Sequence, residues 1–392
     1  MFSKRIEALS PSITIAISTL ARELKAQGRD ILSFSAGEPD FDTPMKIKET
    51  AIEAIKQGAT RYTAVAGIPE LLEAVANKLK RENNLEYEPS DIIVSNGAKQ
   101  SLFNITQALL DEGDEVIIPA PYWVTYPELV KYAGAKPVVV NCDERHGFKM
   151  TAKELEEAIT PNTKMLILTS PSNPTGSVYS KEELERLAKV LEGTNIVVVS
   201  DEMYEKLVFD GTKFVSVASV SEDMFNRTIT VNGLSKSVAM TGWRMGYLAT
   251  PNKELVKKMI ALQSQSTSNI NSITQVASIP ALDGSVDEDI EKMRQAFEAR
   301  AHEAVKLFNE IDGVSVLKPK GAFYLFVNIR DLNVGSMEFC EKLLEEYGVA
   351  VVPGIGFGSE GYFRFSFATD ITTIRLGIRR IKKFVESNYK RK

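Results

Sequence analysis

The sequence predicts an α/β protein in which helices flank a mostly parallel sheet. Short apolar segments alternate with amphipathic segments through the middle of the chain, as in a parallel sheet with connecting helices. The apolar residues of the short segments are continuous, which indicates strands buried on both faces. The two ends of the chain have a different pattern and predict a second, smaller α+β domain.

Residues 46–284 are predicted to form the large domain. Each expected strand there ends in a polar or glycine-rich turn, and most lead into an amphipathic helix. The expected strands with their turns are 91–97, 114–121, 164–176, 195–205, 227–237 and 243–250, and the clearest helices are 98–110, 122–134 and 180–193.

Residues 1–45 and 285–392 are predicted to form the small domain together. The N-terminal part contains an amphipathic helix at 13–28, and the C-terminal part begins with a long charged helix. That helix is expected at 287–310, and short strands at 314–317, 322–329, 349–354 and 362–368.

Composition and charge exclude several classes of function. The chain has 392 residues, of which 44% are hydrophobic, so it can bury a large core. Its 47 basic and 52 acidic residues give a net charge of −5 without long runs of one sign, which predicts neither a nucleic-acid partner nor a membrane surface. Two cysteines and two histidines supply neither a disulfide framework nor a metal site. No long apolar segment or signal peptide is recognisable, so a reducing, cytoplasmic location is expected.

Ligands in open α/β sheets gather at the carboxyl ends of the strands, and the polar residues there are the candidates for a site. "SNGAKQS" (95–101) places Gly97 and Ala98 between a strand and a helix N-terminus, which suits a phosphate. A plain strand-to-helix turn would give the same pattern. In "SPSNPTG" (170–176), two prolines hold Asn173 in a stiff loop, where its amide can bond a ring substituent or simply stabilise the loop.

Asp201 and Lys236 are the candidates with the most specific surroundings. Asp201 follows a buried strand, so its carboxylate is expected to need a positive partner. It would alternatively cap a helix, since "EMYEKLV" (202–208) looks helical. Lys236 lies in "NGLSKSVAMTGWRMGY" (232–247) beside Ser235, and the nearby Arg244 is expected to lower its pKa and to bind a phosphate. A purely structural role for this segment would also explain its composition.

These pieces together predict a pyridoxal 5'-phosphate site. They comprise an anion cradle, a positioned amide, a buried acid, an activated lysine and the aromatic Trp123 for stacking. The chain lacks the glycine fingerprint of nicotinamide enzymes and the P-loop of nucleotide triphosphatases.

The sequence also resembles the class I aminotransferases of fold type I, and within them the bacterial aspartate aminotransferase subgroup. The similarity extends over nearly the whole chain. It is carried, in order, by "AGEPDFDTP" (36–44), "RYTAVAGIPELLEAVA" (61–76), "NGAKQSLFN" (96–104), "PYWVTYPE" (121–128), "SPSNPTG", "SDEMYE" (200–205), "SKSVAMTGWRMGY" (235–247) and "FRFSFA" (363–368).

The resemblance implies a role for each candidate in binding the cofactor. Lys236 would carry the covalent bond and shuttle the proton, and Asp201 would pair with the ring nitrogen. Tyr204 and Asn173 would bond the phenolic oxygen, and Trp123 would stack on the ring. The phosphate would be held by Gly97, Ala98, Ser235 and Arg244, with Tyr62 of a partner subunit in a homodimer.

The resemblance also implies how the substrate is held. Arg364, helped by Asn173 and the backbone of Gly37, would bind the α-carboxylate, although Arg364 could also be a surface cation of an alternating strand. In segment 264–271 the chain lacks the arginine that aspartate aminotransferases of the animal and enterobacterial type use for the distal carboxylate. Lys99 would take that task with Ser12 and Thr14, unless Lys99 is merely solvated at the start of its helix.

The expected reaction is ping-pong transfer of the amino group from L-aspartate to 2-oxoglutarate, giving oxaloacetate and L-glutamate. The N-terminal segment would close over the substrate. Prephenate as a further acceptor is compatible with Lys99 and Thr14. The sequence is also compatible with a β-lyase of the same fold type, or with a non-catalytic regulator that binds the cofactor.

Overall fold

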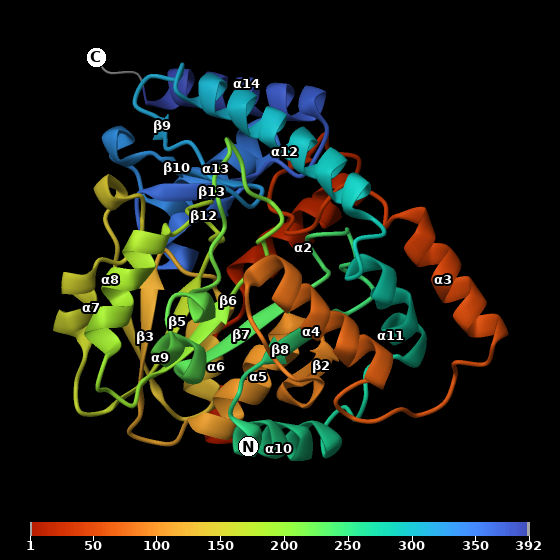
Figure 1. Cartoon of the computed structure of the whole chain (residues 1–392). Coiled ribbons are helices and arrows are strands. Elements are labelled where there is room, and N and C mark those ends of the chain that lie inside the picture. Colours follow the sequence, from red (N-terminus) through yellow and green to blue (C-terminus); the bar gives the residue numbers. More distant parts are fainter. Residues whose placement is uncertain (1, 390–392) are drawn as a thin grey trace.

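The computed structural model describes residues 2–389, and the largest sheet of that part of the chain has seven strands (Figure 1). β8 is antiparallel to both of its neighbours, and all other neighbouring pairs are parallel. The α/β class and the mostly parallel sheet are therefore confirmed. The spatial order is β2 (Ile92–Asn96), β8 (Met245–Ala249), β7 (Thr228–Gly233), β6 (Val197–Asp201), β5 (Thr163–Thr169), β3 (Glu115–Ala120) and β4 (Lys136–Asn141).

The continuous apolar runs exist because successive side chains of one strand enter different cores. In β5, Leu166 and Leu168 pack in one cluster, whereas Met165 and Ile167 belong to the cluster on the other side. All four side chains are at most 3% exposed. Because strand side chains alternate between faces, a strand covered on both faces needs apolar residues at every position.

Helices cover the sheet and several begin at side-chain caps. The Ser180 hydroxyl accepts a hydrogen bond from Glu183 N, and the Glu183 carboxylate accepts one from Ser180 N, so both ends of this capping box are satisfied. The helices of this region are α3 (Met45–Lys56), α4 (Pro69–Asn83), α5 (Ala98–Leu109), α6 (Thr125–Tyr132), α7 (Ala152–Ala158), α8 (Lys181–Leu191), α9 (Glu222–Arg227), α10 (Lys253–Ser264) and α11 (Ser272–Ser278).

The segment around residues 32–33 and the C-terminal part of the chain come together above the carboxyl side of the large sheet. An antiparallel sheet has the order β12 (Val352–Pro353), β13 (Tyr362–Ser366), β10 (Tyr324–Asn328) and β9 (Ser315–Val316), and β1 (Leu32–Ser33) pairs in parallel with β11 (Val349–Ala350). In Figure 1 the blue strands lie above the large sheet, with α12 and α14 across the top. The division at 46–284 remains a prediction. The remaining helices are α1 (Lys4–Glu7), α2 (Ile13–Ala26), α12 (Asp287–Phe308), α13 (Ser336–Tyr347) and α14 (Ile371–Asn388).

The segment after β6 differs from the expected helix at 202–208. It forms turns and a single bridge from Val208 to Gly321, so a helix capped by Asp201 is ruled out. The reason is the side chain of Glu202, which points into the protein and accepts hydrogen bonds from Ser200 Oγ, Ser216 Oγ and Val217 N at 2.7–3.1 Å. These bonds hold the Glu202 side chain inward. The backbone after it closes single turns, from Glu205 N to Glu202 O at 3.0 Å and from Leu207 N to Tyr204 O at 2.8 Å, and does not continue into a helix. Among residues 2–389, no helix combines the length and apolarity needed to cross a bilayer.

Glu202 also predicts a pH-dependent stability. Burial, and next the charge of Glu205, raise its pKa from 4.5 to about 7. Because the folded state binds this proton more tightly than the unfolded chain, Glu202 contributes fully to the stability of the fold below pH 4.5. This contribution is lost as the pH rises through 7. The loss is about 3 kcal/mol for a shift of this size.

We therefore expect Glu202→Gln, which cannot lose a proton, to gain stability relative to the unmutated protein between pH 5 and pH 8. Urea unfolding midpoints at the two pH values measure this difference. The exposed Glu310→Gln serves as the control and should give equal differences at both. Equal differences for Glu202→Gln would contradict the assignment.

Candidate functional site

A cavity of about 300 Å³ lies at the carboxyl ends of the large sheet's strands, beneath the strands of the C-terminal part. It brings together most of the predicted site residues, which come from segments far apart in the sequence. The predicted residues that line it are Thr14, Gly37, Ala98, Lys99, Trp123, Asn173, Asp201, Tyr204, Ser235, Lys236, Arg244 and Arg364. Tyr126, Thr169, Met203 and Tyr324 line it as well and were not predicted.

One wall of the cavity is a basic cradle between β2 and α5. Gly97 (φ 77°) turns the chain so that α5 begins at Ala98, with its free N–H groups at the cavity. The Arg244 guanidinium donates to the carbonyl oxygens of Thr241 and Asn96 at 3.1 and 3.3 Å. A Cβ on Gly97 would lie 2.4 Å from Arg244 Nη2, so only glycine leaves room for the arginine there. Helix N–H groups, this guanidinium and the buried Ser235 hydroxyl form a donor set that fits a phosphate.

Lys236 reaches into the cavity opposite the N-terminal segment. Its Nζ donates a hydrogen bond to the carbonyl oxygen of Gly37 at 2.5 Å. The surroundings together lower the pKa of Lys236 to about 8: burial is the largest cause, Glu38 opposes it, and the charge of Arg244 adds to the lowering. The predicted lowering is therefore present, but desolvation and not the charge of Arg244 is its main cause. About half of the Lys236 amine is thus neutral near pH 8.

Asp201 ends β6 at the floor of the cavity and is held by a neutral partner. Its Oδ2 accepts a hydrogen bond from Tyr126 OH at 2.6 Å, and its Oδ1 accepts one from Met203 N at 3.3 Å. Burial raises the pKa of Asp201, and these hydrogen bonds and the charge of Lys236 oppose the rise. A cation beside this carboxylate would stabilise its charged form.

Arg364 lies at the far side of the cavity and is 2% exposed, so the alternative of a surface cation is ruled out. It is buried because β13 is an inner strand between β12 and β10. Its Nη1 donates to Asn173 Oδ1 at 3.0 Å and its Nη2 to the Ser35 carbonyl oxygen at 2.8 Å, while Nε has no hydrogen-bond partner among residues 2–389. A buried guanidinium with a free N–H is suited to bind a carboxylate.

Lys99 and Thr14 line the mouth of the cavity. Lys99 Nζ lies 4.9 Å from the centre of the Trp123 ring, and burial together with Arg244 lowers the pKa of Lys99. Lys99 is nevertheless exposed on this chain, and its role as a ligand of the distal carboxylate stays a prediction. Thr14 Oγ1 is buried without a protein partner.

Three predicted residues do not line this cavity. Gly97 lies directly behind Ala98, in the cradle. Ser12 accepts a hydrogen bond from Ile15 N at 3.4 Å as the cap of α2, and lines a neighbouring hollow with Tyr122. Tyr62 is 93% exposed on the surface of this chain.

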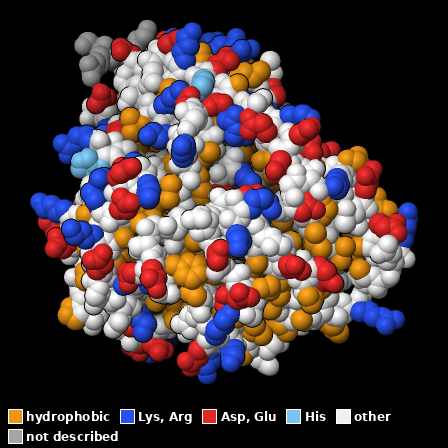
Figure 2. All heavy atoms as spheres, in the orientation of Figure 1, with side chains coloured by type: hydrophobic (Ala, Val, Ile, Leu, Met, Phe, Trp, Pro, Cys, Tyr) orange, Lys and Arg blue, Asp and Glu red, His pale blue; other side chains and the backbone are white. Residues whose placement is uncertain are grey.

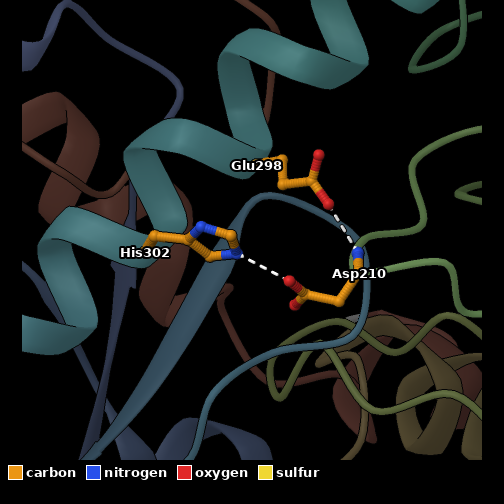
Figure 3. Close-up of side chains that lie close together, drawn as sticks. All are labelled: Asp210, Glu298 and His302. Carbon is orange, nitrogen blue, oxygen red and sulfur yellow. Dashed lines mark hydrogen bonds and ion pairs between the residues drawn. The ribbon is translucent and has the colours of Figure 1, made fainter.

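In a second group of ionisable side chains, Glu298 and His302 of α12 face Asp210 in a neighbouring loop (Figure 3). His302 Nε2 is 2.9 Å from Asp210 Oδ1, and Glu298 Oε1 accepts a hydrogen bond from Asp210 N. Lys318 and Arg294 pair with the remaining carboxylate oxygens at 2.9 and 3.0 Å. These cations already neutralise the acids, so the group serves as an ion-pair network that ties α12 to the loop.

Comparison with known proteins identifies the family. Residues 29–381 match the sequence model of the family described as aminotransferase class I and II, and the chain belongs to this family. The predicted resemblance to the class I aminotransferases is therefore confirmed.

Several relatives are similar over almost their full length. An aspartate aminotransferase of Geobacillus stearothermophilus is 48% identical over 98% of this chain and 99% of its own. A probable aspartate/prephenate aminotransferase of Aquifex aeolicus is 47% identical over 98% of both chains. The solved structure of an aspartate aminotransferase of Thermus thermophilus with maleate superposes with a TM-score of 0.94 at 42% identity, covering 98% of this chain and 99% of the other.

The cradle predicts a specific effect of Gly97→Ala. The new methyl group would displace the Arg244 guanidinium, so we expect binding of pyridoxal phosphate to weaken by at least about tenfold, as for loss of a charge-assisted hydrogen bond. Equilibrium dialysis of the apoprotein measures this affinity.

Gly113→Ala is the matched control for this substitution. Gly113 has a similar φ of 97°, but a Cβ there meets no atom within 4 Å. Both glycines have a positive φ, so both variants carry backbone strain, and only Gly97→Ala should lose affinity. Equal affinities of the two variants would contradict the role of the cradle.

Proposed function

We propose that this protein is a pyridoxal-phosphate-dependent aspartate aminotransferase that transfers the amino group of L-aspartate to 2-oxoglutarate, giving oxaloacetate and L-glutamate. The observation that carries this proposal is the placement of the Lys236 amine in one cavity with the buried acid Asp201, the basic cradle and the buried Arg364. The names of the Geobacillus and Thermus relatives support aspartate as the donor.

The residues of the cavity suit each part of the cofactor. Ala98 N–H, Ser235 and Arg244 would hold the phosphate, and Asp201 would keep the ring nitrogen protonated. Trp123 would cover the ring, and Tyr204 and Asn173 would bond the phenolic oxygen. When bound, pyridoxal phosphate withdraws electrons from the substrate's Cα and thereby makes its proton removable.

Lys236 is the group that moves this proton. Its low pKa, caused by burial, makes the neutral amine available as a base near neutral pH. Arg364 and the Asn173 amide would hold the α-carboxylate, and in this way fix the Cα–H bond relative to Lys236. Lys99 with Thr14, and Ser12 after movement of the N-terminal segment, would bind the second carboxylate.

We further propose that the enzyme is a cytoplasmic homodimer. Tyr62 is almost fully exposed, and on α3 the side chains of Met45, Ile52 and Ile55 are 53–61% exposed. Figure 2 shows hydrophobic side chains along the right edge and lower right of one face, where Figure 1 places α3, α4 and α11. A surface of this kind suits a subunit interface that brings Tyr62 to the phosphate of the partner. A monomeric mass in sedimentation equilibrium would overturn the dimer.

The second candidate function is use of prephenate as an amino acceptor. The name of the Aquifex relative and the flexible Lys99 at the cavity mouth favour it. An assay with prephenate in place of 2-oxoglutarate decides it. Release of pyruvate and ammonia without a keto-acid acceptor would instead indicate a β-lyase, and a bound cofactor without any turnover would indicate a regulator.

The first test concerns Lys236. Borohydride reduction of the holoenzyme should attach a pyridoxyl group to Lys236, and peptide mass spectrometry locates it. Lys236→Ala should lose this adduct and at least about 10³-fold in kcat, because Lys236 both forms the covalent bond and moves the proton. The exposed Lys189→Ala should keep both. An adduct at another lysine would refute the assignment.

The second test concerns Lys99. Lys99→Met keeps much of the apolar stem and removes the charge, so kcat/KM for aspartate should fall by about tenfold or more. L-alanine has no distal carboxylate, and its kcat/KM should change by less than about twofold. Steady-state kinetics with both donors measure the difference. An unchanged value for aspartate would show that the distal carboxylate binds elsewhere.

A further inference from the structure

Tyr324 of β10 contacts three parts of the site. Its hydroxyl lies 2.9 Å from the Tyr204 hydroxyl, and the Arg364 guanidinium lies 4.5 Å from the centre of its ring. A Cβ on Gly37 would lie 3.2 Å from the same hydroxyl. Tyr324 is fully buried and lines the cavity, yet its place in the apolar strand gives it the appearance of a core residue.

The geometry of the two hydroxyls determines the direction of their hydrogen bond once Tyr204 contacts the cofactor. Each phenol has one proton to donate. If Tyr204 donates its proton to the phenolic oxygen of the cofactor, the bond between the two tyrosines requires Tyr324 to donate to Tyr204. A donor behind Tyr204 polarises its O–H bond and strengthens its own donation, as in other hydrogen-bonded chains.

The ring of Tyr324 also supports Arg364. The guanidinium lies over Tyr324 and also 5.1 Å from the centre of the Phe357 ring, while two of its nitrogens bond Asn173 and Ser35. Aromatic faces attract the cation without using its N–H groups. The unpartnered Nε–H therefore remains available for a carboxylate.

We propose that Tyr324 is a positioning residue that orients the Tyr204 hydroxyl toward the cofactor from the same ring that supports the carboxylate-binding Arg364. The inference rests on the proposed function, since it assigns Tyr204 to the cofactor. The two groups of Tyr324 have different tasks. The hydroxyl acts on the cofactor through Tyr204, and the ring acts on the substrate through Arg364.

Tyr324→Phe removes the hydroxyl and keeps the ring. The pH titration of the absorption band of the Lys236-linked cofactor should shift upward by about half a unit, because weaker donation by Tyr204 leaves the phenolic oxygen more basic. Tyr204→Phe should raise the midpoint at least as much. In the Tyr204→Phe background, Tyr324→Phe should cause no further shift, since the group through which it acts is gone.

Binding of maleate, measured by calorimetry, tests whether the Tyr324 hydroxyl also acts on the carboxylate site. Its dissociation constant should change by less than about twofold in Tyr324→Phe, whereas kcat should fall by about fivefold. Tyr87→Phe is the matched control, because it also removes a buried hydroxyl, bonded to Thr230 Oγ1 at 3.2 Å in another core cluster. It should lose similar thermal stability with no change in the band midpoint.

The outcomes distinguish the inference from the proposed function. Absence of a borohydride adduct at Lys236 in the unmutated protein would overturn both. With the adduct present, the inference alone fails if Tyr324→Phe leaves the midpoint unchanged, if it shifts the midpoint equally without Tyr204, or if it weakens maleate binding by tenfold.

Discussion

The cavity depends on the close approach of β8 to the junction of β2 and α5. The antiparallel register pairs Asn96 with Met245 on one side and Gly233 with Gly246 on the other. A Cβ on Gly246 would lie 2.2 Å from Ala98 N, so a side chain at this position would force the strand and the helix apart. Because Arg244 precedes this contact and Ser235 and Lys236 follow β7, one glycine contact fixes the cradle relative to the amine.

The site also holds three ionisable groups away from water, and the fold compensates each of them differently. Arg364 is stabilised by aromatic rings and carbonyl oxygens, Asp201 by a phenol, and Lys236 by a backbone carbonyl. Buried charges cost folding free energy unless they are paired. Their partners here are mostly neutral, so the charges keep their attraction for an anionic carboxylate and for a cationic ring.

The sequence allowed the sheet and most of the site to be predicted, because strands buried on both faces carry continuous apolar runs and charged residues at strand ends are conspicuous. Tyr126 and Tyr324 were missed since their aromatic rings fit the apolar pattern of a core, although Tyr126 lies one helical turn beyond Trp123 in "WVTY". The bond between Tyr324 and Tyr204 joins two strand regions distant in the chain and leaves no local signal. The wrong helix at 202–208 arose because helical spacing does not reveal that Glu202 bonds inward.

The short pairing of β1 with β11 affects the order in which parts of the chain fold during synthesis. Leu32 finds its ladder partner in Val349, close to the other end of the polypeptide. Long-range pairing of this kind forms late, because the intervening chain must first be ordered. During synthesis all strands of the large sheet are made long before β11 emerges. β1 therefore stays unpaired while the large sheet folds. The N-terminal segment, which brings Thr14 to the cavity, is therefore among the first parts of the protein to be made and among the last to be paired.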